Sequence, residues 1–341
     1  MRLLVVAPNW IGDTLLAQPL LARLRARHPG LRIDAVAPDW TAPVLRRMPE
    51  VEEVLEVPFR HGELALGPRI RLARRLRRRR YREAIVLPNS FKSALVPLLA
   101  GIPRRIGFVG EARYALLNVR HRLDEAGLPL MAERYLQLAE APGRPVERPI
   151  PVTRIDVDEA NLLITVSRLG LDRTQPVVAL CPGAEYGPAK RWPARHFASL
   201  ARALARRGRS VWLIGAPGDR AIGDEIAQLA AGEALNLCGR TDLAAAIDLL
   251  SVAECVVTND SGLMHVASAL GRPLVALYGS SSPAHTPPLA PRARIVQLQL
   301  ECSPCFAREC PLGHFRCMNE LAPERVLSEI EAAVAAARER A

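Results

Sequence analysis

The chain has 341 residues, of which 49% are hydrophobic, enough for two domains that each bury a core. No apolar run approaches the roughly 20 residues that span a bilayer, and the short apolar N-terminus passes directly into a strand–turn–helix pattern rather than a secretory signal. Seven cysteines, an odd number with four near the C-terminal end, do not suit a secreted disulfide framework, so we expect a cytoplasmic protein.

The net charge of +11 is confined to the first half of the chain. Residues 1–150 contain 26 Lys and Arg against 15 Asp and Glu, whereas the rest contains 20 of each. This excess predicts an anionic partner for the first half, such as nucleic acid, an acidic membrane face or a phosphorylated substrate.

Strands alternating with helices run through the first 140 residues, a pattern typical of a parallel, doubly wound sheet. The first half is predicted to contain strands at 2–7, 31–37, 54–57 and 83–87, a helix at 14–27 that continues despite Pro19, and a short helix at 40–48.

A second series follows residues 141–151, which contain four prolines and indicate a linker. We therefore predict an α/β protein of two Rossmann-like domains facing across a cleft. The first domain covers 1–150 and the second 151–322, and a last helix within 323–341 could belong to either. The second half is predicted to contain an amphipathic helix at 156–169 and strands at 177–181, 211–214, 234–237, 255–258 and 274–278.

Asp13 ends the segment PNWIGD, which follows the first predicted strand. An aspartate before a helix is commonly an N-cap. At the carboxyl edge of a parallel sheet, where α/β proteins bind ligands, the same carboxylate could instead act as a general base. The residues alone leave both interpretations open.

Residues 69–82, RIRLARRLRRRRYR, contain nine arginines. Ile70, Ala73 and Leu76 form a narrow apolar stripe, which predicts a helix packed on the sheet with a cationic outer face. A merely solvated face is one interpretation, but the lack of acidic partners favours contact with an anionic membrane surface. Nucleic acid is less favoured, because aromatic residues make up 4% of the chain and do not alternate with the arginines.

Two loops in the second half carry residues suited to a phosphorylated sugar. In CPGAEYGPAKRWP, residues 181–193, Lys190 and Arg191 come late in a glycine-rich loop between a strand and a helix, although a solvated basic loop is also open. In GAPGDR, residues 215–220, Asp219 could hold a sugar hydroxyl or cap a helix. No G-x-G-x-x-G follows the first strand and no P-loop motif is present, which argues against dinucleotide redox enzymes and P-loop NTPases.

The stretch VVTNDSGLMHVASALGRPLVALYG, residues 256–279, predicts a buried strand, a tight turn, a helix and a new strand. A Ser-Gly turn at a helix N-terminus points free N–H groups at an anion, typically a phosphate. His265 would lie on the first helical turn, where a packed core histidine and a ligand contact are both plausible.

Four cysteines occur within sixteen residues, in CSPCFARECPLGHFRC. Four thiolates at this spacing suit a tetrahedral structural zinc site, with an iron–sulfur cluster or four reduced thiols as alternatives. The predicted ligands are Cys302, Cys305, Cys310 and Cys317.

Together these segments resemble the lipopolysaccharide core heptosyltransferases of the inverting glycosyltransferase family nine. The resemblance covers nearly the whole chain and is carried by PNWIGD ending at Asp13, GAEYGPAKRW ending at Trp192, TNDSGLMH ending at His265, and RPLVALYGSSSP starting at Arg272. It implies a metal-independent enzyme of GT-B architecture, with the acceptor on the N-terminal domain and ADP-heptose on the C-terminal one.

The resemblance also implies roles for individual residues. Asp13 matches the catalytic base, and Lys190 the lysine at the donor phosphate and sugar. Donor contacts are implied for Glu185, Tyr186, Asp219, Thr241, Asp260, Ser261, Gly262 and His265. The cysteine cluster departs from the simplest family pattern, and the resemblance does not establish zinc there.

The implied reaction is transfer of L-glycero-D-manno-heptose from ADP-heptose to the first heptose of the Kdo–lipid A inner core. Its implied partners are the ADP-heptose donor, the lipid A inner-core acceptor and the anionic inner membrane face, which residues 69–82 would contact peripherally. A family-nine transferase with another acceptor is one alternative. A non-catalytic nucleotide-sugar or nucleic-acid binding protein is a more distant one.

Overall fold

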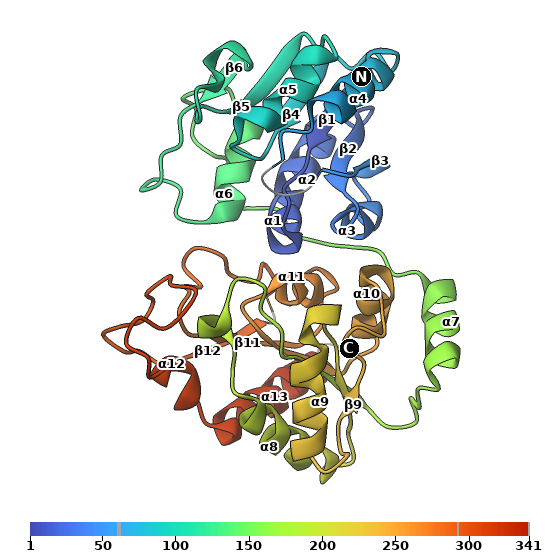
Figure 1. Ribbon diagram of the computed structural model, residues 1–341, viewed down its shortest axis with the longest axis vertical. Coiled ribbons are helices and arrows are strands. Elements are labelled where there is room, and N and C mark those ends of the chain that lie inside the picture. Colours follow the sequence, from blue (N-terminus) through green and yellow to red (C-terminus); the bar gives the residue numbers. More distant parts are fainter. Residues whose placement is uncertain (60–62, 292, 340–341) are drawn as a thin grey trace. The chain divides into compact units, whose positions relative to one another are not determined.

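The computed structural model describes residues 1–59, 63–291 and 293–339, and the chain divides into two compact units, Met1–Thr153 (unit 1) and Arg154–Ala341 (unit 2) (Figure 1). Each unit is built on a six-stranded sheet whose strands all run parallel. The prediction of an α/β fold with two Rossmann-like halves is therefore confirmed. No helix in the described ranges is long and apolar enough to cross a membrane.

Six strands form the sheet of unit 1: β1 (Arg2–Val6), β2 (Arg32–Pro38), β3 (Val51–Val57), β4 (Glu83–Val86), β5 (Arg104–Phe108) and β6 (Val119–His121). Their order is β3-β2-β1-β4-β5-β6, as in dinucleotide-binding sheets. Leu3, Leu4 and Val5 in β1 are each at most 1% exposed, because helices cover both faces of the sheet. The chain reverses its direction of winding between β1 and β4, so their loops open at one edge.

The helices of unit 1 differ from the prediction in two places. The predicted helix at 14–27 is two helices that begin at Ile11 and break at Ala17, and Pro19 lies in the first turn of the second, where a missing N–H is tolerated. The predicted helix at 69–82 begins at Leu66 and ends at Arg77. The helices are α1 (Ile11–Leu16), α2 (Gln18–Arg27), α3 (Ala42–Arg46), α4 (Leu66–Arg77), α5 (Phe91–Leu99) and α6 (Met131–Leu136), with short 3-10 turns at η1 (Arg113–Ala115) and η2 (Gln137–Ala139).

Unit 2 repeats the strand order of unit 1. Its strands are β7 (Val177–Cys181), β8 (Ser210–Leu213), β9 (Leu235–Asn236), β10 (Cys255–Asn259), β11 (Leu274–Tyr278) and β12 (Ala293–Gln297), arranged β12-β11-β10-β7-β8-β9. The edge strand β12 was not predicted from the sequence. Its sequence ARIVQ buries Val296 while Ile295 is 43% exposed, so the apolar pattern typical of a central strand is missing.

Helices pack on the unit 2 sheet around a core that includes Phe197, Leu200, Val257 and Ile330. They are α7 (Glu159–Leu169), α8 (Ala194–Ala205), α9 (Arg220–Leu229), α10 (Leu243–Ser251), α11 (Gly262–Ala269), α12 (Arg316–Asn319) and α13 (Pro323–Arg338), with 3-10 turns at η3 (Pro188–Lys190) and η4 (Pro217–Asp219).

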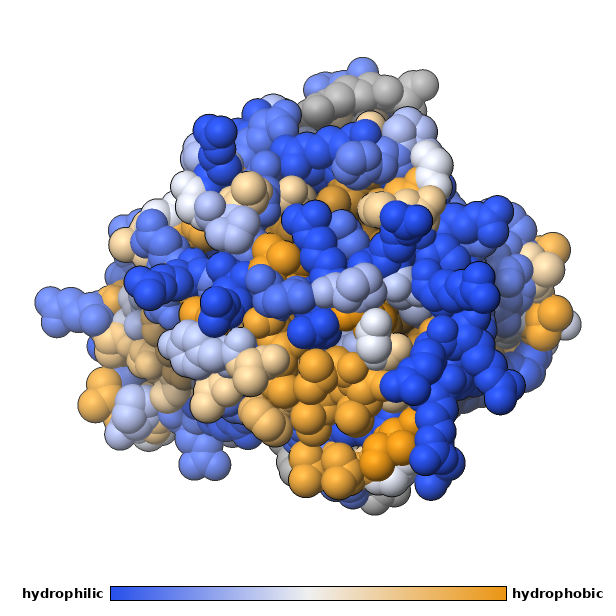
Figure 2. All heavy atoms as spheres, turned by 90° about the horizontal axis from the view of Figure 1, so that it is seen from above, coloured by the Kyte–Doolittle hydropathy of each residue, from blue (hydrophilic) through white to orange (hydrophobic). Residues whose placement is uncertain are grey.

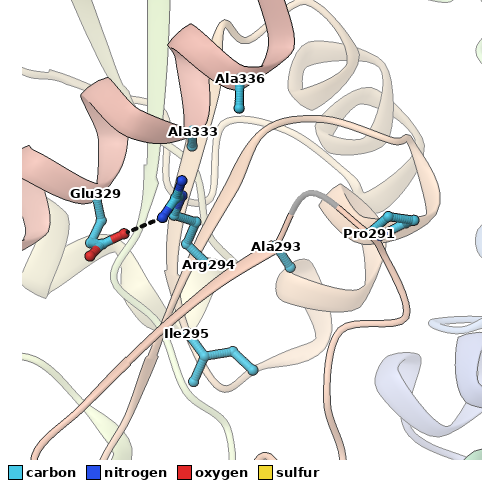
Figure 3. A pocket seen from close by; sticks show the side chains of 7 residues that line it. All are labelled: Pro291, Ala293, Arg294, Ile295, Glu329, Ala333 and Ala336. Carbon is cyan, nitrogen blue, oxygen red and sulfur yellow. Dashed lines mark hydrogen bonds and ion pairs between the residues drawn. The ribbon is translucent and has the colours of Figure 1, made fainter. Parts of the chain in front are cut away.

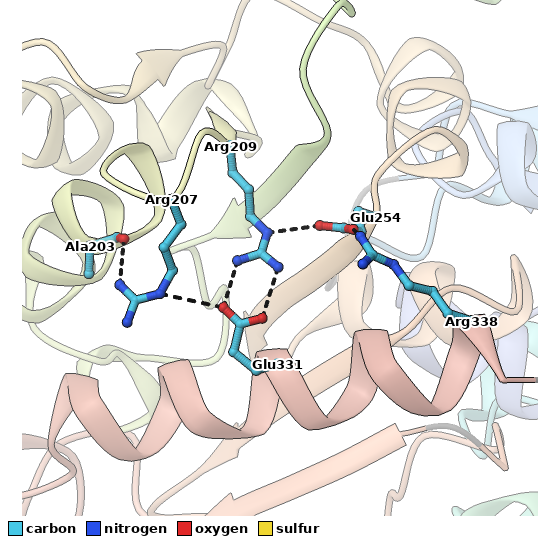
Figure 4. Close-up of polar contacts among 6 residues, drawn as sticks. All are labelled: Ala203, Arg207, Arg209, Glu254, Glu331 and Arg338. Carbon is cyan, nitrogen blue, oxygen red and sulfur yellow. Dashed lines mark hydrogen bonds and ion pairs between the residues drawn. The ribbon is translucent and has the colours of Figure 1, made fainter.

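The last helix, α13, is held to unit 2 by an ion-pair network around Arg209 (Figure 4). The Arg209 guanidinium lies 2.6 Å from Glu331 on α13 and 2.9 Å from Glu254, which precedes β10. Arg207 and Arg338 extend the network from either side. The side chain of Arg209 is 10% exposed, so this pairing takes place largely out of water.

Candidate active site

The winding of the unit 2 sheet reverses between β7 and β10, which lie side by side. Loops that follow such a pair of strands open a crevice in which α/β proteins bind ligands. The predicted donor residues all follow strands at this carboxyl edge: Glu185, Tyr186 and Lys190 after β7, Asp219 after β8, Thr241 after β9, and Asp260, Ser261, Gly262 and His265 after β10.

Asn259, the last residue of β10, joins the two loops at this edge. Its side-chain amide donates to the carbonyl of Pro182 at 2.8 Å, and its side-chain oxygen accepts the backbone N–H of Trp192 at 3.1 Å. Both Asn259 and Trp192 are fully buried. The sequence prediction did not single out either residue, although a buried strand that ends in an amide was a signal that Asn259 bonds to its neighbours.

Lys190 and Asp260 form an ion pair within the crevice. The Lys190 ammonium lies 2.5 Å from a carboxylate oxygen of Asp260. The Asp260 side chain is 6% exposed and that of Lys190 is 17% exposed, so the pair is poorly screened by water. The loop residue predicted to contact a phosphate therefore meets the predicted phosphate-type turn.

The helix α11 begins directly after this pair, with Ser261 at its N-cap. The Ser261 side chain does not cap the helix and lies 3.2 Å from the Thr258 hydroxyl instead. The backbone N–H groups at Gly262 and beyond point out of the helix N-terminus, a geometry that favours an anion.

His265 lies one turn into α11 and is 6% exposed. Burial lowers the pKa of its imidazole to about 4, although Asp260 opposes the shift and Lys190 adds to it. His265 is therefore neutral at pH 7, and a neutral ring beside the pair can donate or accept one hydrogen bond without adding charge.

Asp219 lies at the start of α9, and its side chain packs so closely against two glycines that neither position has room for a side chain. A Cβ on Gly183 would lie 2.3 Å from its carboxylate, and one on Gly215 would lie 2.9 Å from it. The carboxylate accepts the backbone N–H of Ala216 at 2.9 Å. Burial raises the pKa of Asp219, and the Ala216 hydrogen bond and the nearby Arg191 partly oppose this rise. Asp219 occupies the N-cap position of α9, but its side chain makes no cap bond there and instead accepts the Ala216 N–H in the capping box of η4.

Thr241, Glu185 and Tyr186 complete the predicted donor residues. Thr241 follows the turn in which the Gly239 N–H donates to the Gly215 carbonyl, and its buried hydroxyl has no hydrogen-bond partner among the described residues. Glu185 is exposed, and the Tyr186 ring lies 5.0 Å from the Lys190 ammonium. Tyr186 thus lies near Lys190, and both Glu185 and Tyr186 are exposed to solvent.

Asp13, the predicted base, lies in unit 1. It sits in the first turn of α1, whose N-cap is Trp10, so the predicted N-cap role of Asp13 is wrong. Its side chain is half-buried, and its charge adds to the burial that raises the pKa of Tyr135. The carboxylate follows β1 at the reversal point of the sheet, where a ligand-facing role is expected.

A second group of polar residues lines a pocket of about 50 Å³ at the same edge of unit 1. Asn9, Ser90 and Lys92 contribute to its wall, and Arg69 is buried beside them. The guanidinium of Arg69 lies 4.1 Å from the centre of the Phe59 ring and donates to the Leu64 and Lys92 carbonyls.

The fully buried Arg113 supports this wall. Its guanidinium donates to the Pro88 carbonyl at 2.6 Å and to the Asn89 side chain at 3.1 Å. Arg113 therefore fixes the loop between β4 and α5. Its sequence context gave no sign of this role.

Most of the arginines predicted to form a cationic face are exposed. Two are exceptions: Arg69 is buried, and Arg79 pairs with Glu53 at 2.7 Å, so the prediction that the stretch lacks acidic partners is wrong for Arg79. Figure 2 shows a face of the molecule on which strongly hydrophilic residues crowd beside an apolar patch. The exposed arginines of this stretch are Arg71, Arg74, Arg75, Arg77, Arg78, Arg80 and Arg82.

The four predicted zinc ligands are free thiols: Cys302, Cys305 and Cys310 lie in the segment before α12, and Cys317 lies in α12 itself. The pKa of Cys317 is raised by burial, with smaller contributions from Cys305, Cys310 and Cys302. Across the described residues, however, no three His, Cys, Asp or Glu side chains form a group able to hold a metal ion. The zinc site stays a prediction.

A larger pocket, of about 390 Å³, lies between β12 and α13, away from the crevice (Figure 3). Its charged groups, Arg294 and Glu329, pair with each other at 3.2 Å. Such a wall offers no converging polar groups for a phosphorylated ligand. The remaining lining residues are Pro291, Ala293, Ile295, Ala333 and Ala336.

The chain contains two Rossmann-like units, and unit 2 presents a lysine and a helix N-terminus where the winding of its sheet reverses. Together these features define a nucleotide-sugar transferase of GT-B type. The family model for glycosyltransferase family 9 (heptosyltransferase) matches residues 69–316, and the chain belongs to this family. It is a glycosyltransferase.

Known relatives are similar over nearly the whole chain. Lipopolysaccharide heptosyltransferase 2 of Escherichia coli is 44% identical, covering 97% of this chain and 98% of that protein. The same enzyme of Salmonella typhimurium is also 44% identical, covering 97% of both chains. The solved structure of E. coli ADP-heptose lps heptosyltransferase II matches with a TM-score of 0.89 at 43% identity, covering 99% of this chain and 100% of that one.

Proposed function

We propose that the chain transfers L-glycero-D-manno-heptose from ADP-heptose to the first heptose of the Kdo–lipid A inner core, in lipopolysaccharide core biosynthesis. The observation that carries the donor assignment is the Lys190–Asp260 pair at the start of α11, where N–H groups and an ammonium converge. Similarity to relatives named heptosyltransferase 2 supports the choice of heptose and acceptor.

In this proposal Asp13 takes the proton from the acceptor hydroxyl, which attacks the anomeric carbon from the face opposite ADP and inverts its configuration. The transition state is oxocarbenium-like, and negative charge grows on the departing diphosphate. Lys190 and the N–H groups at Ser261 and Gly262 stabilise that charge, and the reaction needs no catalytic cofactor. The neutral His265 adds no charge to this corner at pH 7.

Asp219 and Thr241 would bind hydroxyl groups of the donor, because a carboxylate and an unpartnered hydroxyl suit sugar recognition. Glu185 and Tyr186 would contact the donor from the exposed side of the Lys190 loop.

We assign the acceptor to unit 1. Its excess of basic residues and the pocket beside Arg69 and Lys92 suit an anionic inner-core group. The exposed arginines of residues 69–82 would hold the enzyme peripherally at the anionic cytoplasmic face of the inner membrane. No nucleic acid partner is part of this proposal.

The deciding experiment is a transferase assay with ADP-heptose and two acceptors, Kdo–lipid A with and without its first heptose. We expect product with the heptosylated acceptor alone. Product with the unheptosylated acceptor would instead assign the chain to the step of heptosyltransferase I. Tight ADP binding without turnover on either lipid would favour a non-catalytic nucleotide-sugar binding protein.

The zinc prediction is tested separately, by metal analysis of protein purified without chelators. About one zinc per chain, lost when the four cysteines are replaced by serine, would support it. Fully soluble protein that contains no metal would refute the zinc prediction.

A further inference from the structure

Residues 302–317, here called the thiol segment, contact the turn that follows β11. The Ser303 hydroxyl donates to the Gly279 carbonyl at 2.6 Å, and the Phe306 N–H donates to the Ser280 carbonyl at 2.7 Å. Cys317 packs so closely that a Cβ on Gly279 would lie 3.1 Å from its sulfur. This turn lies beside the Asp260–Gly262 turn, because β10 and β11 are neighbours.

The other side of the thiol segment holds the loop that carries Lys190. The Ala189 N–H donates to the Arg308 carbonyl at 3.0 Å, and the Tyr186 hydroxyl donates to the Phe306 carbonyl at 2.7 Å. A Cβ on Gly187 would lie 2.4 Å from the Arg308 carbonyl oxygen, so no larger residue fits there without displacing the segment. Both polar groups of the Phe306 backbone are thus used: its N–H bonds to the turn after β11, and its carbonyl bonds to the loop that carries Lys190.

Apart from Cys317, which packs against the core of unit 2, few apolar contacts fix the thiol segment. Phe306 is 54% exposed and Leu312 is 61% exposed. Cys305, next to Phe306, is exposed, and the Cys310 sulfur accepts the Phe315 N–H at 3.4 Å. Since little core packing resists a shift, chemical changes at the thiols are expected to move the backbone of Phe306 and Arg308.

We infer that the thiol segment is a modification site that controls donor binding: an adduct on its cysteines displaces Phe306 and Arg308 and, through them, Lys190. The reagent class is a soft electrophile such as a maleimide. The thiolate sulfur bonds to one carbon of the activated double bond, and the other carbon takes a proton from water, so nothing is oxidised or reduced. The inference rests on the proposed contact of Lys190 with the donor diphosphate.

The first test is ADP binding, measured by calorimetry before and after treatment with N-ethylmaleimide. We expect the ADP Kd to rise by about tenfold, as for loss of one charged hydrogen bond. Cys181, Cys238 and Cys255 are buried, so mass spectrometry should place the adducts on the thiol segment. The Cys305→Ser variant should bind ADP normally and lose most of the effect.

An unchanged ADP Kd in protein shown to carry adducts on the thiol segment would overturn the inference. Failure of untreated protein to bind ADP would instead count against the proposed function, so the two outcomes are distinct.

A second test needs no reagent. Gly187→Ala should raise the KM for ADP-heptose by about tenfold while leaving the acceptor KM unchanged. The matched control is Gly30→Ala, because a Cβ on Gly30 meets nothing within 4 Å. If Gly187→Ala folds with the wild-type Tm and keeps the wild-type donor KM, the thiol segment does not position Lys190.

Discussion

The ammonium of Lys190 lies 2.5 Å from the carboxylate of Asp260, a side chain that is 6% exposed. Because water solvates these buried charges poorly, each charge is stabilised mainly by the other. Asp260 also orients the lysine at the start of α11, where the proposed diphosphate would bind. We therefore expect stability and donor affinity to be coupled at this pair.

We predict that Lys190→Ala loses both properties. Removing one partner of a buried pair leaves an uncompensated charge, which typically costs about 3–5 kcal/mol of unfolding free energy. ADP affinity should fall by at least about tenfold. The double variant Lys190→Met, Asp260→Asn should recover most of the stability in urea unfolding but none of the ADP affinity. Recovery of ADP binding in the double variant would contradict the role of Lys190.

The base assignment predicts a different pattern for Asp13→Asn. General base catalysis typically contributes about 10²–10⁴-fold, so kcat should fall by about that factor. ADP-heptose binding should stay within about twofold of wild type, because donor binding is assigned to other residues. Glu125→Gln, an exposed change in the same unit, serves as the control. Joint loss of turnover and donor binding would remove Asp13 from the role of base.

Much of the fold was predictable because β7 and β11 are uniform runs of buried apolar residues, and their predicted bounds match the structure. β12 was missed because an edge strand needs to bury little, and here Val296 alone is fully covered. The motifs correctly pointed to Lys190 and Asp260, which form an ion pair. They did not predict the structural roles of Asn259 and Arg113, because these side chains bond to backbone groups that are distant in sequence.

His265 predicts a loss of stability on acidification. Its pKa is about 4 in the folded chain against about 6.5 when unfolded, so the unfolded state binds the proton first as the pH falls below about 6.5. Between pH 7 and pH 5 this should cost about 2 kcal/mol, with the loss complete only below about pH 4. Urea unfolding of His265→Gln should show that much less dependence on pH than wild type. Identical pH dependence in both proteins would contradict a buried neutral histidine.

The cationic stretch predicts binding to anionic lipid. Reversing Arg71, Arg74 and Arg78 to Glu should weaken binding to vesicles containing acidic lipid by at least about tenfold, since each basic residue near such a surface contributes about 1 kcal/mol. The acceptor KM should rise and the donor KM should not. The control applies the same charge change in unit 2, at Arg168, Arg173 and Arg206, which are also exposed. Equal weakening by both triple variants would show that net charge, not this surface, determines binding.

The network at α13 predicts a graded effect of its arginines (Figure 4). Arg209 bonds both Glu254 and Glu331 and is 10% exposed, whereas Arg338 is 70% exposed. Arg209→Met should therefore cost about 1–3 kcal/mol of unfolding free energy, because the Glu254 carboxylate, whose side chain is 16% exposed, loses a charged partner. Arg338→Met should cost less than about 1 kcal/mol, as exposed pairs do. Urea unfolding of both variants measures the difference, and equal costs would mean that burial does not set the strength of this network.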